Sequence, residues 1–144
     1  DSGTFDYFTD EVNGDEGVSR TDYNASENDN DTVTGVSGNV GALGYFGFSY
    51  LLENEGTVKG VAIDSGDGCV EPSADNVQSG DYTPLARPLF IYIRTEAASR
   101  PEVQGFVQYY VDNQDAIAEE ALYIPLDDTQ KGEQADSLAT VLAG

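Results

Sequence analysis

The groups best suited to chemistry lie at the start of the chain, in the triplet Ser2, Gly3 and Thr4. The triplet opens a predicted helix that Ser2 or Thr4 can cap. An apolar stripe at helical spacing follows it, made of Phe5, Phe8 and Val12. Backbone N–H groups and two hydroxyls at a helix amino terminus attract anions, so the triplet predicts a cradle for an oxyanion. Ser and Thr also cap ordinary helices, and the residues alone leave both interpretations open.

Most catalytic and metal chemistry is excluded because the chain contains no histidine. A Ser-His-Asp triad, a His-paired nucleophile and a His-ligated metal therefore cannot form. Ser2 as a nucleophile would need a lysine or carboxylate base, and the sequence singles none out. Two acidic clusters, residues 28–31 and 64–68, could bind a hard cation such as Ca²⁺, but neither has the spacing of a calcium loop. We expect solvated acidic turns there, no cofactor, and no enzyme.

The charge balance is extreme, with 27 Asp and Glu against 6 Lys and Arg and a formal net charge of −21. Nucleic acid is excluded as a partner because phosphate backbones need basic patches. Acid spread along a sequence with periodic apolar blocks, and with very little lysine, indicates adaptation to high salt. A Debye length of about 3 Å at 1 M salt screens the self-repulsion of such a surface. The composition therefore predicts a halophilic source.

The length of 144 residues suits one domain or two partial ones. No apolar run approaches the roughly 18 residues of a transmembrane helix, and the first residues do not form a signal peptide. Export would need a signal or anchor upstream of this chain. Cys69, the only cysteine, is either a thiol in a polar loop or one half of a disulfide to a cysteine outside the chain.

Residues 13–40 are rich in Gly, Asn, Asp and Ser, and we expect them to form an exposed loop. Two sequons for N-glycosylation fall in this stretch, at Asn24 and Asn30. Both fit a glycosylated, exported protein. Such triplets also arise by chance in Asn-rich sequence, so glycosylation and coincidence both remain open.

Short strands and helices alternate along the chain, which predicts an α/β fold. Strands are expected at residues 43–46, 58–63 and 89–93. The last of these is an unbroken apolar run, which indicates burial on both faces. Beyond the opening helix, further helices are expected at residues 48–54, 75–79, 101–111, 115–121 and 133–142, with Pro101 at or near a first helical position.

Three sequence blocks occur in order: SGTFDYF at residues 2–8, GALGYFG at residues 41–47, and YTPLARPLFIY at residues 82–92. Together they resemble the phosphate-binding proteins that serve phosphate ABC transporters, over Ser2 to about Leu126. The resemblance implies a two-lobed, venus-flytrap fold of the periplasmic-binding-protein type, with phosphate held between the lobes. The family's second lobe supplies an arginine followed four residues later by Ser-Gly-Thr. Ser2, Gly3 and Thr4 fall on that triplet, and the arginine would lie before Asp1.

The resemblance further implies that the chain is roughly the C-terminal half of such a protein, and its acidity suggests a haloarchaeal source. Residues 1–57 would belong to the second lobe, residues 58–63 would be a hinge or crossing strand, and residues 64–144 would return to the first lobe. The implied partners are inorganic phosphate, an ABC permease and the missing N-terminal part of the same protein. The implied location is extracellular, with the membrane reached only through an upstream anchor.

Two alternative functions remain beside phosphate capture. The first is a binding protein for another oxyanion, such as sulfate. The second is an extracellular structural or assembly component built from half of this fold, because apolar surface without its lobe partner must be covered by something.

Overall fold

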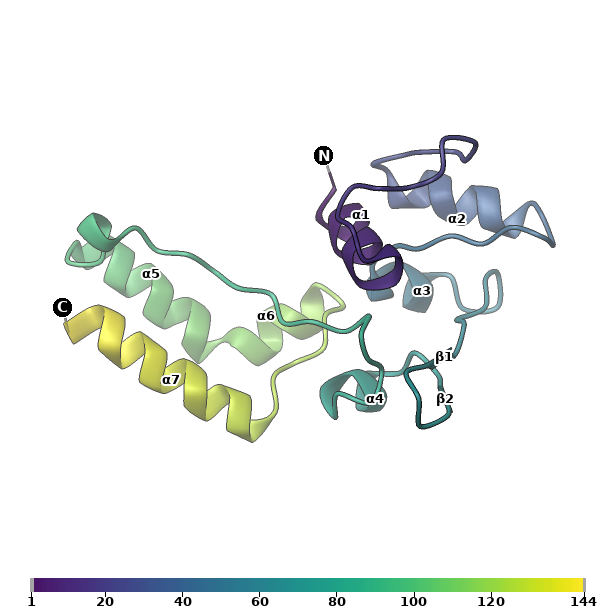
Figure 1. The fold of residues 1–144 in the computed structure, drawn as a ribbon. Helices are drawn as coiled ribbons and strands as arrows, with labels where there is room; N and C mark the ends of the chain where they lie inside the picture. Colours follow the sequence, from purple (N-terminus) through teal and green to yellow (C-terminus); the bar gives the residue numbers. More distant parts are fainter. Residues whose placement is uncertain (1, 144) are drawn as a thin grey trace. The chain divides into compact units, whose positions relative to one another are not determined.

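The computed structural model describes residues 2–143, and the chain divides into two compact units, Asp1–Ala86 and Arg87–Gly144. Helices account for most of the regular structure in both units (Figure 1). The sheet found in the described residues is one antiparallel pair of two-residue strands, β1 (Ile63–Asp64) and β2 (Cys69–Val70). Ile63 pairs with Val70, and Asp64 pairs with Cys69. The fold therefore contains helix and sheet, with the helices dominant.

The first unit is built around four short helices. They are α1 (Gly3–Phe8), which runs on into the π-helical turn η1 (Thr9–Asn13), then α2 (Asp29–Ser37), α3 (Phe48–Glu53) and α4 (Ala74–Gln78). Side-chain caps begin three of them, because Ser2, Asn28 and Ser73 each accept a hydrogen bond from a backbone N–H in the first turn. Contacts join α2 to α3, and Val33 of α2 is buried.

The second unit pairs two longer helices. It contains a short 3₁₀ turn, η2 (Thr95–Ala97), followed by α5 (Pro101–Asp112), α6 (Gln114–Glu120) and α7 (Asp128–Ala143). Helices α5 and α7 lie side by side (Figure 1). Val107 of α5 and Ala98 are the buried apolar residues of this unit among those described. No helix within residues 2–143 is long and apolar enough to cross a membrane.

The helix predictions from sequence are largely confirmed, because helix signals are local. The opening helix, the helix after Gly47, the single turn before Gly80 and the helix starting at Pro101 all form where expected. The final helix begins earlier than predicted, at Asp128. The prediction of a loop for residues 13–40 is wrong in part, since α2 lies within it. Both sequon residues are exposed, Asn24 in the loop before α2 and Asn30 in its first turn.

The strand predictions are wrong in the described structure. Residues 43–46 and 89–93 have no partner strand within residues 2–143, and only Ile63 of the segment 58–63 joins a strand. Burial of the run 89–93 is also contradicted, because Phe90 is 69% exposed and Tyr92 is 90% exposed. The physical reason is that a strand needs a neighbour to pair its N–H and C=O groups, and no described segment pairs with these.

Gly44 lies so close to helix α2 that a side chain at this position would collide with it. An added Cβ there would lie 2.8 Å from Cγ2 of Val36 and 2.9 Å from Cγ2 of Thr32, both on α2. We expect Gly44→Ala in the complete protein to lower the free energy of unfolding by about 1–3 kcal/mol through overpacking. Urea unfolding measures this value. Gly35→Ala is the control, since a Cβ at this α2 position meets no atom within 4 Å and should stabilise the helix by up to about 1 kcal/mol. Equal stability of Gly44→Ala and the wild type would contradict the packing argument.

The apolar core of the described residues is small. The buried apolar residues among those described are Val33, Ala98 and Val107, whereas large side chains such as Leu43 and Phe106 are exposed. Ordering the backbone costs about 1–2 kcal/mol per residue, which this burial does not offset. We expect the isolated 144-residue chain to show no cooperative thermal transition when followed by circular dichroism. A single sharp transition would contradict this expectation.

Candidate functional site

Ser2, one of the two cap residues that the sequence allowed, caps helix α1. Its backbone is extended, with φ −136° and ψ 111°, and its Oγ accepts a hydrogen bond from the N–H of Phe5 at 3.3 Å. The Ser2 carbonyl accepts from the N–H of Asp6 at 2.9 Å. Gly3 and Thr4 are exposed, and the Thr4 hydroxyl makes no hydrogen bond within residues 2–143. The triplet therefore lies at an exposed helix end, where Ser2 already accepts hydrogen bonds from the N–H groups of Phe5 and Asp6.

Thr9 links the carboxyl end of α1 to the following loop through hydrogen bonds of its side chain. Its side chain is 1% exposed, and its Oγ1 donates to the Phe5 carbonyl at 2.8 Å, with the Asp6 carbonyl a further 3.0 Å contact. The same oxygen accepts the N–H of Gly17 at 2.8 Å. This buried hydroxyl is fully used by local backbone groups, so its role is structural.

Two neighbouring residues of α1 join it to distant segments. The ring of Phe8 stacks on that of Tyr45, with centroids 3.9 Å apart and planes 7° from parallel. The Tyr7 hydroxyl donates a hydrogen bond to the Pro84 carbonyl. Burial, and secondarily Tyr23, raises the pKa of Tyr45 above its usual value. Residues of all three blocks that carry the family resemblance therefore meet at α1.

The local electrostatics of α1 favour neutral donors as anion ligands. The helix has an acidic residue in its first turn, Asp6, and no basic residue in its last turn. An anion at this end would be held by N–H and hydroxyl groups together with the helix dipole. An anion site at Ser2, Gly3 and Thr4 stays a prediction.

Residues of the two acidic clusters accept backbone hydrogen bonds that cap a helix and close a turn. Asn28 Oδ1 caps α2 by accepting from the N–H of Asn30 at 3.1 Å. Asp64 Oδ1 accepts from the N–H groups of Gly66 at 2.8 Å and Gly68 at 3.1 Å, which closes the turn between β1 and β2. Within residues 2–143, no three His, Cys, Asp or Glu side chains converge as metal ligands. Cys69 is an exposed free thiol in β2.

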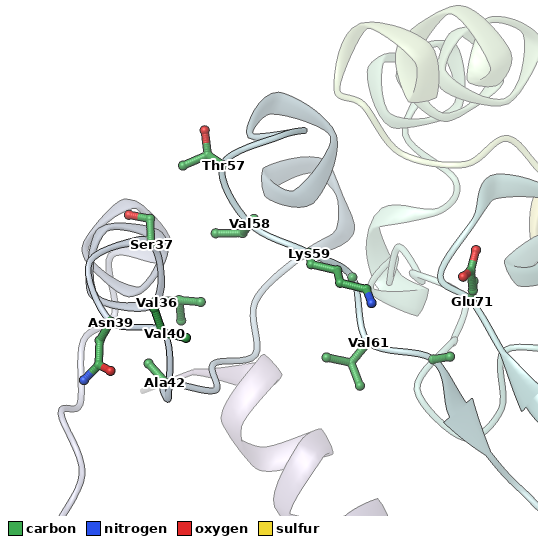
Figure 2. Close-up of a pocket in the computed structure, with 12 residues that line it drawn as sticks. Val36, Ser37, Asn39, Val40, Ala42, Thr57, Val58, Lys59, Val61 and Glu71 are labelled. Atoms are coloured by element: carbon green, nitrogen blue, oxygen red, sulfur yellow. The ribbon is translucent and has the colours of Figure 1, made fainter.

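A separate hollow in the first unit was not predicted from sequence. Its volume is about 490 Å³, and it lies between the end of α2 and the extended segment 57–62 (Figure 2). Valine and alanine side chains make much of its lining, with Lys59 and Glu71 among the polar residues. The triplet Ser2, Gly3 and Thr4 is not part of it. No motif in the sequence signals this hollow, because its walls come mainly from two segments with ordinary apolar residues.

Comparison with known proteins defines the class. Residues 1–114 match the family described as "PBP superfamily domain". This match covers most of the chain, so the chain belongs to the PBP superfamily and has a periplasmic-binding-protein-like fold. The fold class predicted from the sequence is thereby confirmed.

Two further proteins are similar to this chain, and one of them is named for phosphate binding. The chain is similar to Protein SphX of Synechococcus elongatus, with 45% identity over 127 residues, 88% of this chain and 37% of the relative. It is similar to the phosphate-binding protein PstS of Staphylococcus aureus, with 32% identity over 140 residues, 94% of this chain and 41% of the relative. The name of the second relative confirms the resemblance drawn from the three blocks.

A solved structure gives the same class. The crystal structure of a possible phosphate binding protein from Planctomyces limnophilus matches with a TM-score of 0.76 and 42% identity, over 98% of this chain and 51% of that chain. The chain therefore spans between about two fifths and one half of the length of these similar proteins. The assignment of residues 1–57, 58–63 and 64–144 to lobes and hinge stays a prediction.

Proposed function

We propose that this chain is part of a solute-binding protein that captures inorganic phosphate outside the cell and delivers it to an ABC permease. Membership of the PBP superfamily and the names of the relatives support this proposal. The observation that carries it is the meeting of the three blocks at α1, where Tyr7 contacts Pro84 and Phe8 contacts Tyr45. In this proposal the protein binds and releases its ligand without catalysing a reaction.

The proposed ligands in this chain are the backbone N–H groups and hydroxyls of Ser2, Gly3 and Thr4. They would bind phosphate oxygens through charge-assisted hydrogen bonds, which are roughly twice as strong as neutral ones. The net charge of −21 does not prevent binding, because charges more than about 10 Å away are largely screened at 0.1 M salt. Fixed donors in contact with the anion therefore outweigh the distant acidic surface.

The remaining parts of the proposal concern the whole protein. Residues 1–57 would form part of one lobe, residues 58–63 would cross between lobes, and residues 64–144 would form part of the other. The N-terminal part of the protein would supply the other ligands of phosphate and, through an upstream anchor, the membrane attachment. Extracellular glycans at Asn24 and Asn30 are compatible with their exposure.

Sulfate binding and a structural or assembly role are the two alternatives to phosphate capture. Sulfate is also a tetrahedral oxyanion, and it differs from phosphate in having no proton to donate at neutral pH. A buried acceptor left without that proton costs about 1–3 kcal/mol, so a phosphate site rejects sulfate. A structural or assembly role is favoured by one observation, the exposed apolar segment 89–93. The relatives' names favour ligand capture over that role.

The site assignment is tested with the double variant Ser2→Ala and Thr4→Ala in the complete protein. We expect the affinity for inorganic phosphate to fall at least tenfold, which corresponds to about 1.4 kcal/mol, because two hydroxyl donors are lost. Isothermal titration calorimetry measures the affinity, and competition with sulfate measures selectivity.

A matched control separates ligand contacts from helix capping. Ser73→Ala removes the cap of α4, where Ser73 Oγ accepts from the N–H of Asn76 at 3.2 Å, much as Ser2 does in α1. This variant should lose similar stability and keep its phosphate affinity. Unchanged affinity in the Ser2 and Thr4 variant would reject the assignment, and equal competition by sulfate would favour a general oxyanion site.

We also propose that the acidic surface is an adaptation to high salt. None of the acidic side chains among residues 2–143 is buried. Raising KCl from about 0.1 M to about 2 M should raise the melting temperature of the complete protein by at least about 5 °C, because screening reduces self-repulsion. Differential scanning calorimetry measures this shift, with an uncharged osmolyte as the control. A melting temperature that salt leaves constant would contradict the adaptation.

A further inference from the structure

Helix α1 is too short to maintain its own orientation. It contains 6 residues and continues into a single π-helical turn. Isolated helices shorter than about 12–15 residues are marginal in water, so contacts with other segments determine where the amino terminus of α1 points. Three consecutive residues, Tyr7, Phe8 and Thr9, make such contacts.

The three contacts differ in reach and in direction. Thr9 bonds to its own helix and to Gly17, so it fixes only the following loop. The stacking of Phe8 on Tyr45 is a contact between flat surfaces, which sets a distance but permits sliding. The bond from Tyr7 to Pro84 is directional and joins residues 77 positions apart. Of the three, this bond best constrains the rotation of α1.

We propose that Tyr7 is a positioning residue for the anion site. Its hydroxyl, bound to the Pro84 carbonyl, sets the direction of α1 and thereby the direction of the donors at Ser2, Gly3 and Thr4. This inference rests on the proposed function. Donors fixed in advance bind an anion more tightly, and the apparent affinity falls in proportion to the fraction of molecules in the competent arrangement.

A second phenol in the same unit provides a matched comparison. The Tyr82 hydroxyl donates to the Val61 carbonyl at 3.2 Å. Tyr82 lies two positions before Pro84 in the chain and, like Tyr7, is partly buried and donates to a distant backbone carbonyl. Its bond connects to the segment before β1 and not to α1. Removing the Tyr7 hydroxyl therefore takes away a contact of α1 itself. Removing the Tyr82 hydroxyl takes away a contact nearby in the chain and leaves the contacts of α1 unchanged.

The experiment compares Tyr7→Phe with Tyr82→Phe in the complete protein. Inorganic phosphate is titrated by calorimetry, and thermal unfolding is followed without phosphate. We expect both variants to lose a similar small amount of stability, since each loses one hydrogen bond. Tyr7→Phe should bind phosphate about threefold to tenfold more weakly, and Tyr82→Phe should stay within about twofold of the wild type. Amide hydrogen exchange in residues 3–8 should be faster in Tyr7→Phe than in Tyr82→Phe.

Each other outcome rejects one specific statement. If the two variants bind phosphate equally well, or weaken equally, Tyr7 contributes only stability and the positioning role is wrong. If exchange in α1 is the same in both, the proposed cause is wrong even where affinity changes. If the wild-type protein itself does not bind phosphate, the proposed function fails and the inference falls with it.

Discussion

The attachment of α1 to residues far away in the sequence is the interaction on which the first unit depends. Phe8 stacks on Tyr45, and the next residue back along that segment, Gly44, lies close against α2. The extended segment 42–47 therefore connects α1 to α2 although it forms no strand. A helix as short as α1 gains its orientation from such contacts and not from its own propensity. The glycine at position 44 allows this approach, because a side chain there would collide with Thr32 and Val36 of α2.

Ion pairs contribute little to this fold. Four of the basic side chains pair with acidic ones among the described residues, namely Arg20 with Asp22, Arg94 with Glu96, Arg100 with Glu102, and Lys131 with Asp115. Most of these groups are well exposed, and exposed pairs are typically worth about 0–1 kcal/mol. Three of the pairs are only two positions apart in the chain, so they do not join separate elements. These ion pairs therefore do little to determine the fold.

Helices and caps could be predicted from the sequence, whereas pairing could not. Ser2 as the cap of α1 and Pro101 at the start of α5 follow from local chemistry, and both predictions are confirmed. Helix α2 was missed because Gly35 and its polar neighbours weaken the apolar pattern, although the cap residue Asn28 was a usable signal. The bond from Tyr7 to Pro84 had no signal at all, since nothing in either residue specifies a partner so distant in the chain.

The segment 89–93 has the apolar composition of a buried strand, and yet it forms no strand within the described residues. Apolar residues occupy both faces of this extended run, which is the composition of a central strand covered on two sides. Its backbone has no partner strand within residues 2–143, and its side chains are mostly exposed. The chain spans only two fifths to one half of the length of its relatives. The run has the composition of a central strand, but no segment within residues 2–143 supplies the neighbours that such a strand needs. Burial is a property of the whole sheet and not of one strand, so an apolar run alone does not establish a buried strand.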